Sequence, residues 1–152
     1  MAKVIEVRDL YKLYRVGDEI VRALDGLDFS IYEGEFCAIV GTSGSGKSTL
    51  LNMLAGLEKP TKGSVVIGGQ HIETLNEEQL VKFRRENVGF IFQSFHLLGT
   101  LNALENVALP LSFRGMSKEK RLKKADEMLD LVKLKKHKNH RPNQMSGGQQ
   151  QR

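Results

Sequence analysis

The sequence has one cysteine, three prolines and no tryptophan. A lone cysteine cannot close a disulfide within the chain, and Cys37 stands in an apolar run, so we expect a small buried side chain. No apolar run approaches the ~18 residues that a membrane-spanning helix needs. The first residues, Met1 to Glu6, lack the apolar stretch of a secretion signal, so we expect a cytosolic location.

What is present is the composition of an ordinary globular protein, with 40% hydrophobic and 27% charged residues in a length of 152 that suits one domain. The net charge of +5 is local, because Arg114 to Arg141 contains eleven Lys and Arg against four Asp and Glu. Such a stretch can meet anionic lipid headgroups, nucleic acid or an acidic protein surface. More often it is a solvated helix face with its loop, which is the interpretation we adopt.

The rest of the chain is organised around a glycine-rich segment. The apolar run Phe36 to Val40 predicts a buried strand before it, and Leu50 to Ala55 predicts a helix after it. The spacing Gly-x-x-x-x-Gly-Lys-Ser between them is the P-loop pattern. Its residues are Gly41, Thr42, Ser43, Gly44, Ser45, Gly46, Lys47, Ser48 and Thr49.

Each type of residue in this segment has a physical role in holding a polyphosphate. The glycines let the backbone approach a ligand closely, so that successive amide N–H groups point into one concavity at the positive end of the helix. Lys47 is expected to meet the β- and γ-phosphates, and the hydroxyl of Ser48 is expected to bind Mg²⁺. The segment therefore predicts a nucleoside triphosphate site.

Alternating apolar residues predict further strands, bounded by turns at Val16 to Glu19 and at Gly68-Gly69. Gln93 stands at the end of the last of them, where ligands of open α/β sheets bind. Tyr11 and Tyr14 are both candidates for stacking on a nucleotide base. The strands are expected at residues 4–10, 20–24, 27–31, 64–67 and 88–92.

Helix starts are marked by capping residues. Asn76 with Gln79 and Asn102 with Glu105 resemble capping boxes, and Ser117 is expected to cap a third helix. The first helix is expected to run to about Arg85, the second to be disturbed at Pro110 and the third to carry an apolar stripe. That stripe consists of Leu122, Ala125, Leu129 and Val132.

A last cap, Ser146, is followed by Gly147, Gly148 and Gln149, and the glycines would expose the first amides of a new helix as a second anion site. With the P-loop, Gln93 and the helical block between them, this order resembles the nucleotide-binding domain of ABC transporters along the whole chain. The family's Leu-Ser-Gly-Gly-Gln signature stands here as Met145 to Gln149. Residues 93–98 and 104–110 look most like the branch for lipoprotein release, macrolide export and antimicrobial-peptide export.

The resemblance implies ATP and Mg²⁺ as ligands. It implies that Tyr14 is the adenine-stacking aromatic and that Gln93 contacts Mg²⁺ and the attacking water. Two such domains are expected to pair head to tail, so that Ser146, Gly147, Gly148 and Gln149 meet the ATP of the partner domain. Transmembrane permease subunits are the other expected partners, which implies a cytoplasmic protein peripheral on the membrane, and no nucleic acid is expected.

The implied fold is α/β, a P-loop NTPase with an N-terminal antiparallel β subdomain and a helical insertion. The expected parts are a β-rich lead-in (1–34), the P-loop core (35–94), a helical subdomain (95–141) and the signature with the start of its helix (142–152). Family members continue into a strand with the Walker B aspartate and the catalytic glutamate, then a switch histidine. No residue here matches these, so we interpret the chain as the N-terminal portion of such a domain and assign no general base.

Two other functions stay open. One is a non-hydrolysing ATP-binding module, the literal interpretation of a chain without the Walker B strand. The other is a non-transport relative that acts on nucleic acid or ribosomes, which the basic stretch allows. A GTPase is disfavoured because no Asn-Lys-x-Asp motif for reading the base occurs.

Overall fold

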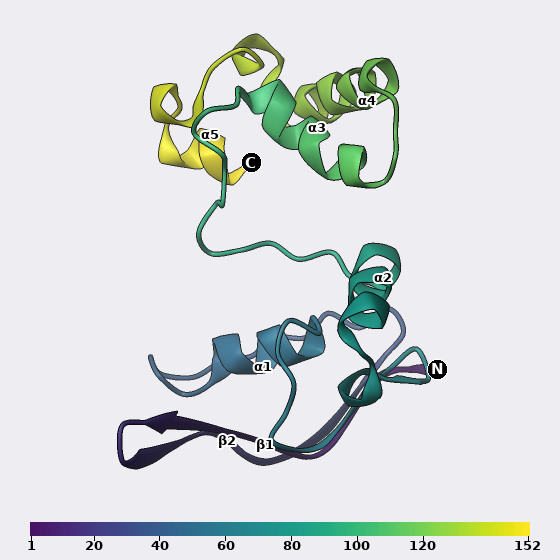
Figure 1. The fold of residues 1–152 in the computed structure, drawn as a ribbon, viewed down its shortest axis with the longest axis vertical. Coiled ribbons are helices and arrows are strands. Elements are labelled where there is room, and N and C mark those ends of the chain that lie inside the picture. The colour runs from purple at the N-terminus through teal and green to yellow at the C-terminus, as the bar shows by residue number, and fades with distance from the viewer. The chain divides into compact units, whose positions relative to one another are not determined.

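The computed structural model describes residues 1–152 and divides them into two compact units, Met1–Phe90 and Ile91–Arg152 (Figure 1). Each unit has a hydrophobic core of its own. The finer division expected from the sequence, with boundaries after residues 34, 94 and 141, stays a prediction.

The first unit is built on a four-stranded antiparallel sheet of order β2-β1-β3-β4. Its long hairpin confirms the strand expected at 4–10 and the turn at 16–19. The strands expected at 20–24 and 27–31 are one strand, because shifts of register next to Gly26 absorb the extra residue while pairing with β1 continues. The strands are β1 (Lys3–Val16), β2 (Glu19–Tyr32), β3 (Lys62–Ile67) and β4 (Gln70–His71).

Two α-helices, α1 (Lys47–Leu54) and α2 (Glu77–Asn87), and the 3₁₀ turn η1 (Ile72–Thr74) pack with this sheet (Figure 1). The helix expected after the P-loop is thus present, and so is the capping box of Asn76 and Gln79 that opens α2. Both the strands and the helices contribute to one core. Its buried residues are Val7, Leu10, Leu24, Leu50, Met53, Val65, Ile72, Leu75, Leu80 and Phe83.

Two strands expected from apolar runs are not strands in the structure. Residues 36–40 and 88–92 have no ladder partner in the sheet. Phe36 is fully exposed, and Val40 and Ile91 are 91% and 92% exposed. Apolar composition favours a strand only where a neighbouring strand supplies the hydrogen bonds, and none does so here. The prediction that Cys37 is a buried core residue is wrong for the same reason, since its side chain is exposed.

The second unit is helical. It contains α3 (Ala103–Phe113), α4 (Lys118–Leu131), the short 3₁₀ helices η2 (Lys135–His137) and η3 (Pro142–Gln144), and α5 (Gly147–Gln151) (Figure 1). The apolar stripe expected on α4 faces the interior, with Ala125 and Leu129 buried. Leu129 packs with Ala103 and Leu134, and the partly buried Met145 packs against the same cluster.

The caps of this unit follow the sequence with one difference, at Ser117. Asn102 forms the expected capping box, and Ser146, expected as a cap, forms a capping box with Gln149. Ser117 stands at the cap position of α4, yet its side chain makes no capping hydrogen bond. The helix expected to be disturbed at Pro110 has that residue in its interior and continues to Phe113.

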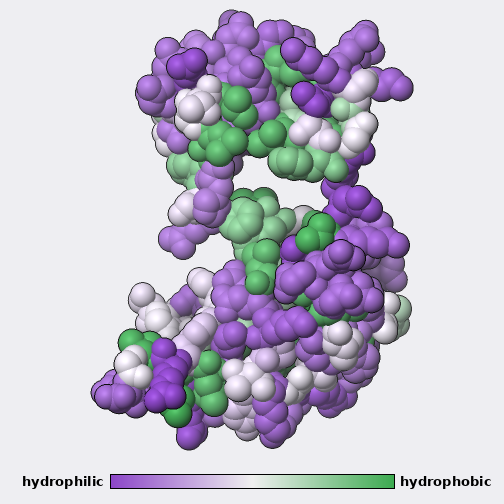
Figure 2. All heavy atoms as spheres, in the orientation of Figure 1, coloured by the Kyte–Doolittle hydropathy of each residue, from purple (hydrophilic) through white to green (hydrophobic).

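Apolar side chains appear on the surface of both units (Figure 2). In the second unit the most exposed large apolar side chains are Ile91, at 92%, Phe113, at 79%, and Leu131, at 74%. No helix in the structure combines the length and the apolar composition that crossing a membrane requires.

Candidate nucleotide-binding site

The P-loop turns into α1 at Gly46, whose φ of 86° lies in the left-handed region. A Cβ at this position would collide with the carbonyl oxygen of Ala23 in β2, so only glycine lets the loop lie this close to the sheet. Gly46 also has no side chain with which to cap α1. The first amides of the helix are therefore left without a cap side chain and face the loop, which suits an anion.

Lys47 holds its ammonium group over the loop. Its Nζ donates to the carbonyl oxygens of Gly41, at 2.9 Å, and Thr42, at 2.5 Å, and lies 3.3 Å from Oγ of Ser45. A positive charge is thus fixed inside the glycine-rich turn. Phosphate oxygens, which carry more negative charge than carbonyls, would compete for the same donors.

Two hollows border the loop. One, of about 210 Å³, lies between Gly44–Thr49 and residues 21–23 of β2, and the other, of about 410 Å³, lies between the loop and the apolar side chains of Leu24, Leu27 and Phe29. Ser48 is exposed beside the first. The loop therefore has room on both sides for a ligand larger than a single phosphate.

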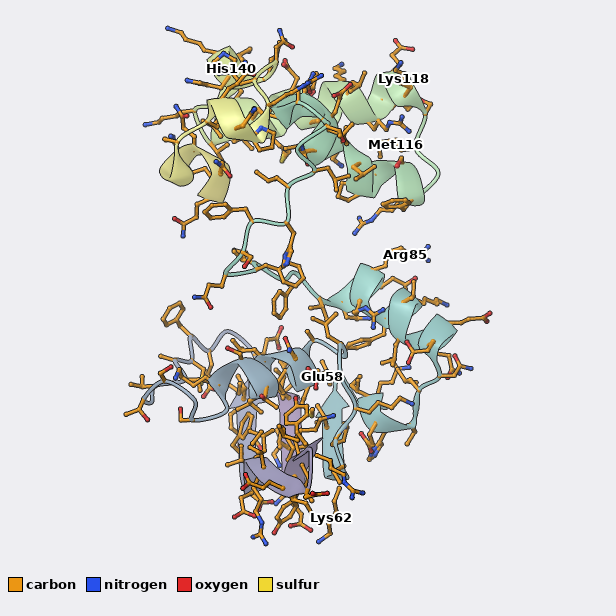
Figure 3. The ribbon with its side chains drawn as sticks, turned by 60° about the vertical axis from the view of Figure 1, so that its left-hand side comes forward. Glu58, Lys62, Arg85, Met116, Lys118 and His140 are labelled. Carbon is orange, nitrogen blue, oxygen red and sulfur yellow. The ribbon has the colours of Figure 1, made fainter.

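Tyr14 is held close to the end of α1. Its hydroxyl donates a 2.6 Å hydrogen bond to Oε2 of Glu58, which lies just after that helix (Figure 3). The other oxygen of Glu58 accepts from Asn52 of α1 at 3.1 Å. Nζ of Lys12 lies 5.1 Å from the centre of the Tyr14 ring, a cation–π distance. The ring is therefore fixed at its hydroxyl and has a cation near its face.

The ionisation of this pair follows from the same contacts. Burial raises the pKa of Tyr14 above its ordinary value of 10.0, the bond to Glu58 raises it further, and a bond with Thr49 lowers it. The hydrogen bond from Tyr14 lowers the pKa of Glu58 below 4.5, against the effect of partial burial. Both shifts favour a neutral phenol that donates to an ionised carboxylate.

Tyr11, the other aromatic candidate, has a different environment. It packs on Gly26 of β2, and Nζ of Lys62 lies 5.1 Å from its ring centre. It therefore covers the hairpin, whereas Tyr14 reaches α1. Glu58 and Asn52, which hold Tyr14, were missed by the sequence reasoning. Their link to Tyr14 spans 44 residues and left no local pattern to find.

The remaining predicted site residues belong to the helical unit. Gln93 is exposed in a bend before α3. Ser146 caps α5, its Oγ accepting from the backbone N–H of Gln149 at 3.3 Å. Gly147 and Gly148 are exposed, and a Cβ at either would meet only open space.

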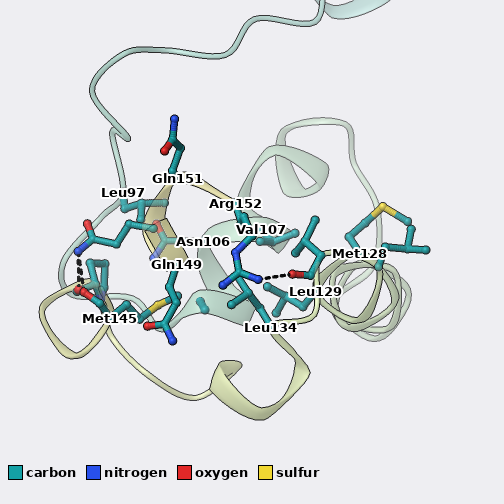
Figure 4. Close-up of a pocket in the computed structure, with 15 residues that line it drawn as sticks. Leu97, Asn106, Val107, Met128, Leu129, Leu134, Met145, Gln149, Gln151 and Arg152 are labelled. Carbon is teal, nitrogen blue, oxygen red and sulfur yellow. Dashed lines mark hydrogen bonds between the residues drawn. The ribbon is translucent and has the colours of Figure 1, made fainter. Parts of the chain in front are cut away.

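A cavity of about 310 Å³ lies within the helical unit beside α5 (Figure 4). Apolar side chains of α3 and α4, such as Val107 and Met128, line it together with Met145 and Gln149. At one side of it Arg152 donates to the carbonyl of Val132, at 3.1 Å. The short α5 is thereby tied back to the end of α4.

The residues at the P-loop are better suited to a metal ion that is bound together with a nucleotide than to a metal ion that the protein holds by itself. The structure has no group of three or more His, Cys, Asp or Glu side chains that could bind an ion. Mg²⁺ commonly takes one or two protein ligands and completes its shell with phosphates and water. The exposed hydroxyl of Ser48, next to the helix start, is suited to such a minor share.

The family model for ABC transporters matches residues 24–152. An ABC transporter ATP-binding protein of Thermotoga maritima is 48% identical over all of this chain, which covers 65% of that relative. The macrolide export ATP-binding/permease protein MacB of Escherichia coli K12 is 45% identical over the whole chain, which covers 24% of it. The chain thus spans just under two thirds of its first relative and about a quarter of MacB.

Among solved structures, the dimeric ATP-binding cassette MJ0796 in a post-hydrolysis state with ADP and Pi superposes with a TM-score of 0.89 at 47% identity. That match covers 96% of this chain and 65% of the other. MJ0796 comes from Methanocaldococcus jannaschii. A P-loop on a matching fold, with the family model over most of the sequence, shows that this chain belongs to the ABC transporter family and is part of an ATP-binding domain of that family.

Proposed function

We propose that this chain binds MgATP at the P-loop and that the protein it belongs to couples ATP hydrolysis to transport. The observation that carries the proposal is the glycine cradle at the start of α1, in which Lys47 already donates to two loop carbonyls. A carbonyl is a weaker partner for an ammonium group than a phosphate is. Binding would therefore exchange these contacts for stronger ones.

Each part of the site has a role in this proposal. The residues from Gly41 to Thr49 surround the phosphates with amide donors, and Lys47 neutralises charge on the β- and γ-phosphates. Ser48 would give its hydroxyl to the metal, and Gln93 would contribute a further ligand and orient the attacking water. Bound Mg²⁺ would supply charge neutralisation on the phosphates. The ring of Tyr14, held by Glu58, offers a face on which adenine stacks.

A second copy of the domain completes the site. The dimer described for MJ0796 with ADP and Pi supports a pair of copies, and we propose that the pair is arranged head to tail. In such a pair Ser146, Gly147, Gly148 and Gln149 of one copy meet the phosphates held by the other. ATP then favours the closed pair and hydrolysis favours the open one, which is a ligand-controlled two-state element.

Coupling to a membrane protein is supported by a relative that joins both parts. MacB is an export ATP-binding/permease protein, and this chain matches 24% of it along the full 152 residues. We propose permease subunits as partners and a position at the cytoplasmic face of the membrane. Substrate choice would then reside in the permease.

The test is a calorimetric titration with MgATP of the protein and of two lysine variants. Lys47→Ala should abolish measurable heat of binding. Lys82→Ala, which changes an exposed lysine of α2, should leave the affinity unchanged. Equal affinities of Lys47→Ala and the unmodified protein would overturn the proposal.

A further inference from the structure

The side chain of Gln149 bridges two segments of the helical unit. Its Oε1 accepts the backbone N–H of Ser146 at 2.8 Å, which is half of the capping box of α5. Its Nε2 lies 3.1 Å from Nε2 of His137, in η2. One glutamine amide is therefore shared between the signature segment and the basic loop before it.

The contact with Ser146 determines the direction of the contact with His137. Because Oε1 of Gln149 already accepts a hydrogen bond, the atom that faces His137 is the NH₂ group, which can only donate. Nε2 of His137 must then carry a lone pair, so the proton of the neutral ring is on Nδ1. The capping box and the imidazole thus require one tautomer.

Beyond Gln149, the His137 ring contacts His140. Nδ1 of His137 is buried and has no hydrogen-bond partner, and the same holds for Nδ1 of His140. The two rings meet edge to face, with centroids 5.1 Å apart and planes at 88°. The contact with Gln149 is therefore the side-chain hydrogen bond that orients the His137 ring.

The backbone that carries His137 is held from three sides. The first two amides of α3, Ala103 and Leu104, donate to the carbonyls of His140, at 2.8 Å, and Lys138, at 2.9 Å. The His137 N–H donates to Leu134 at 2.8 Å. Nζ of Lys138 pairs with Asp126 of α4 at 2.8 Å. His137 is therefore presented to Gln149 by a fixed loop (Figure 3 labels the neighbouring His140).

We propose that His137 is a positioning residue for the signature segment. By accepting from Gln149, it holds the glutamine side chain in the capping box and keeps Ser146 at the start of α5. The inference rests on the proposed function in one respect only, namely that the oriented Ser146 meets the phosphates held by a second copy.

Two variants that place the same functional group, an amide, at position 137 separate a positioning role of His137 from a general effect on the stability of the protein. In His137→Gln the side-chain amide oxygen can occupy the place of Nε2, whereas in His137→Asn it reaches only as far as Nδ1. The control is Lys136→Ala, an exposed position in the same 3₁₀ turn. The readouts are the ¹⁵N shifts of the His137 ring and the exchange rate of the Ser146 amide in nucleotide-free protein at about pH 8, where an ordinary imidazole is neutral.

In the unmodified protein and in Lys136→Ala, we expect ¹⁵N chemical shifts of the His137 ring that are typical of the Nδ1–H tautomer. We also expect slow hydrogen exchange of the Ser146 amide in both. His137→Asn should exchange about fivefold faster at Ser146, the loss of one net hydrogen bond, and His137→Gln should restore the slow rate. An Nε2–H tautomer, or equal rates in the Gln and Asn variants, would overturn the inference. Because no nucleotide is present, a failure here is distinct from a failure of MgATP binding at Lys47.

A separate measurement of self-association tests the consequence for the proposed site between two copies. With MgATP added, His137→Asn should weaken self-association while its affinity for MgATP at the P-loop stays unchanged, and His137→Gln should behave as the unmodified protein does. Association equally strong in the two variants would show that Ser146 needs no such support.

Discussion

The hydroxyl of Tyr14 and the carboxylate of Glu58 are joined by a 2.6 Å hydrogen bond between β1 and the turn after α1. The bond links the aromatic residue expected to stack on adenine with the helix that begins in the P-loop. It therefore places two parts of the proposed site on one rigid connection. Asn52 of α1 extends that connection through the second oxygen of Glu58.

Truncating Tyr14 separates the contribution of the ring from that of its tether. Tyr14→Ala should weaken MgATP binding by about 1–3 kcal/mol, the usual contribution of one base stacked on an aromatic ring. Tyr14→Phe keeps the ring and loses one hydrogen bond, so it should lower the unfolding free energy by about 1 kcal/mol with a smaller effect on affinity. Titration calorimetry and denaturant unfolding measure the two quantities. Tyr11→Ala serves as the matched control, and an effect on affinity as large as that of Tyr14→Ala would remove the case for Tyr14.

The same pair predicts a pH dependence of stability. The folded protein lowers the pKa of Glu58 below its ordinary 4.5, chiefly through the hydrogen bond from Tyr14. This contribution is fully present above pH 4.5 and is lost as the pH falls through the lowered folded value. Glu58→Gln removes it, so the difference in unfolding free energy between the unmodified protein and the variant should shrink between about pH 7 and about pH 3. A difference that stays constant over this range would contradict the assignment.

Two glycine substitutions in the P-loop should have unequal effects. Both Gly44 and Gly46 have positive φ, at 79° and 86°, so alanine costs about 1–2 kcal/mol at either position. At Gly44 the added Cβ meets open space, but at Gly46 it meets the carbonyl of Ala23. Gly46→Ala should therefore lower the midpoint of thermal unfolding more and should also disrupt MgATP binding. Equal midpoints for the two variants would mean that the loop does not lie against β2.

The helix caps of the helical unit offer a further matched pair. Asn102 accepts the N–H of Glu105 at 2.8 Å, whereas Ser117 makes no side-chain capping bond. Asn102→Ala should lower the unfolding free energy by about 1 kcal/mol, and Ser117→Ala should change it by only a few tenths. Chemical denaturation followed by circular dichroism measures both. A larger loss at Ser117 would show that its hydroxyl caps α4 in solution.

Features that depend on neighbours in the sequence were determined by the sequence alone. The P-loop, the helix after it, the capping boxes of Asn76 and Asn102 and the cap at Ser146 were all predicted, because their interactions join residues only a few positions apart. The resemblance to ABC transporter ATP-binding domains rests on the same local motifs, and the family match confirms it. Apolar spacing likewise identified the buried face of α4.

What depends on distant partners was decided only by the tertiary structure. The apolar runs at 36–40 and 88–92 were expected to be strands, yet no neighbouring strand pairs with them, and Cys37 is exposed as a result. Glu58 beside Tyr14 and His137 beside Gln149 carry no motif, since each pair is brought together by packing across 44 and 12 residues. A strand or a side-chain contact needs both of its partners, and sequence patterns describe only one partner at a time.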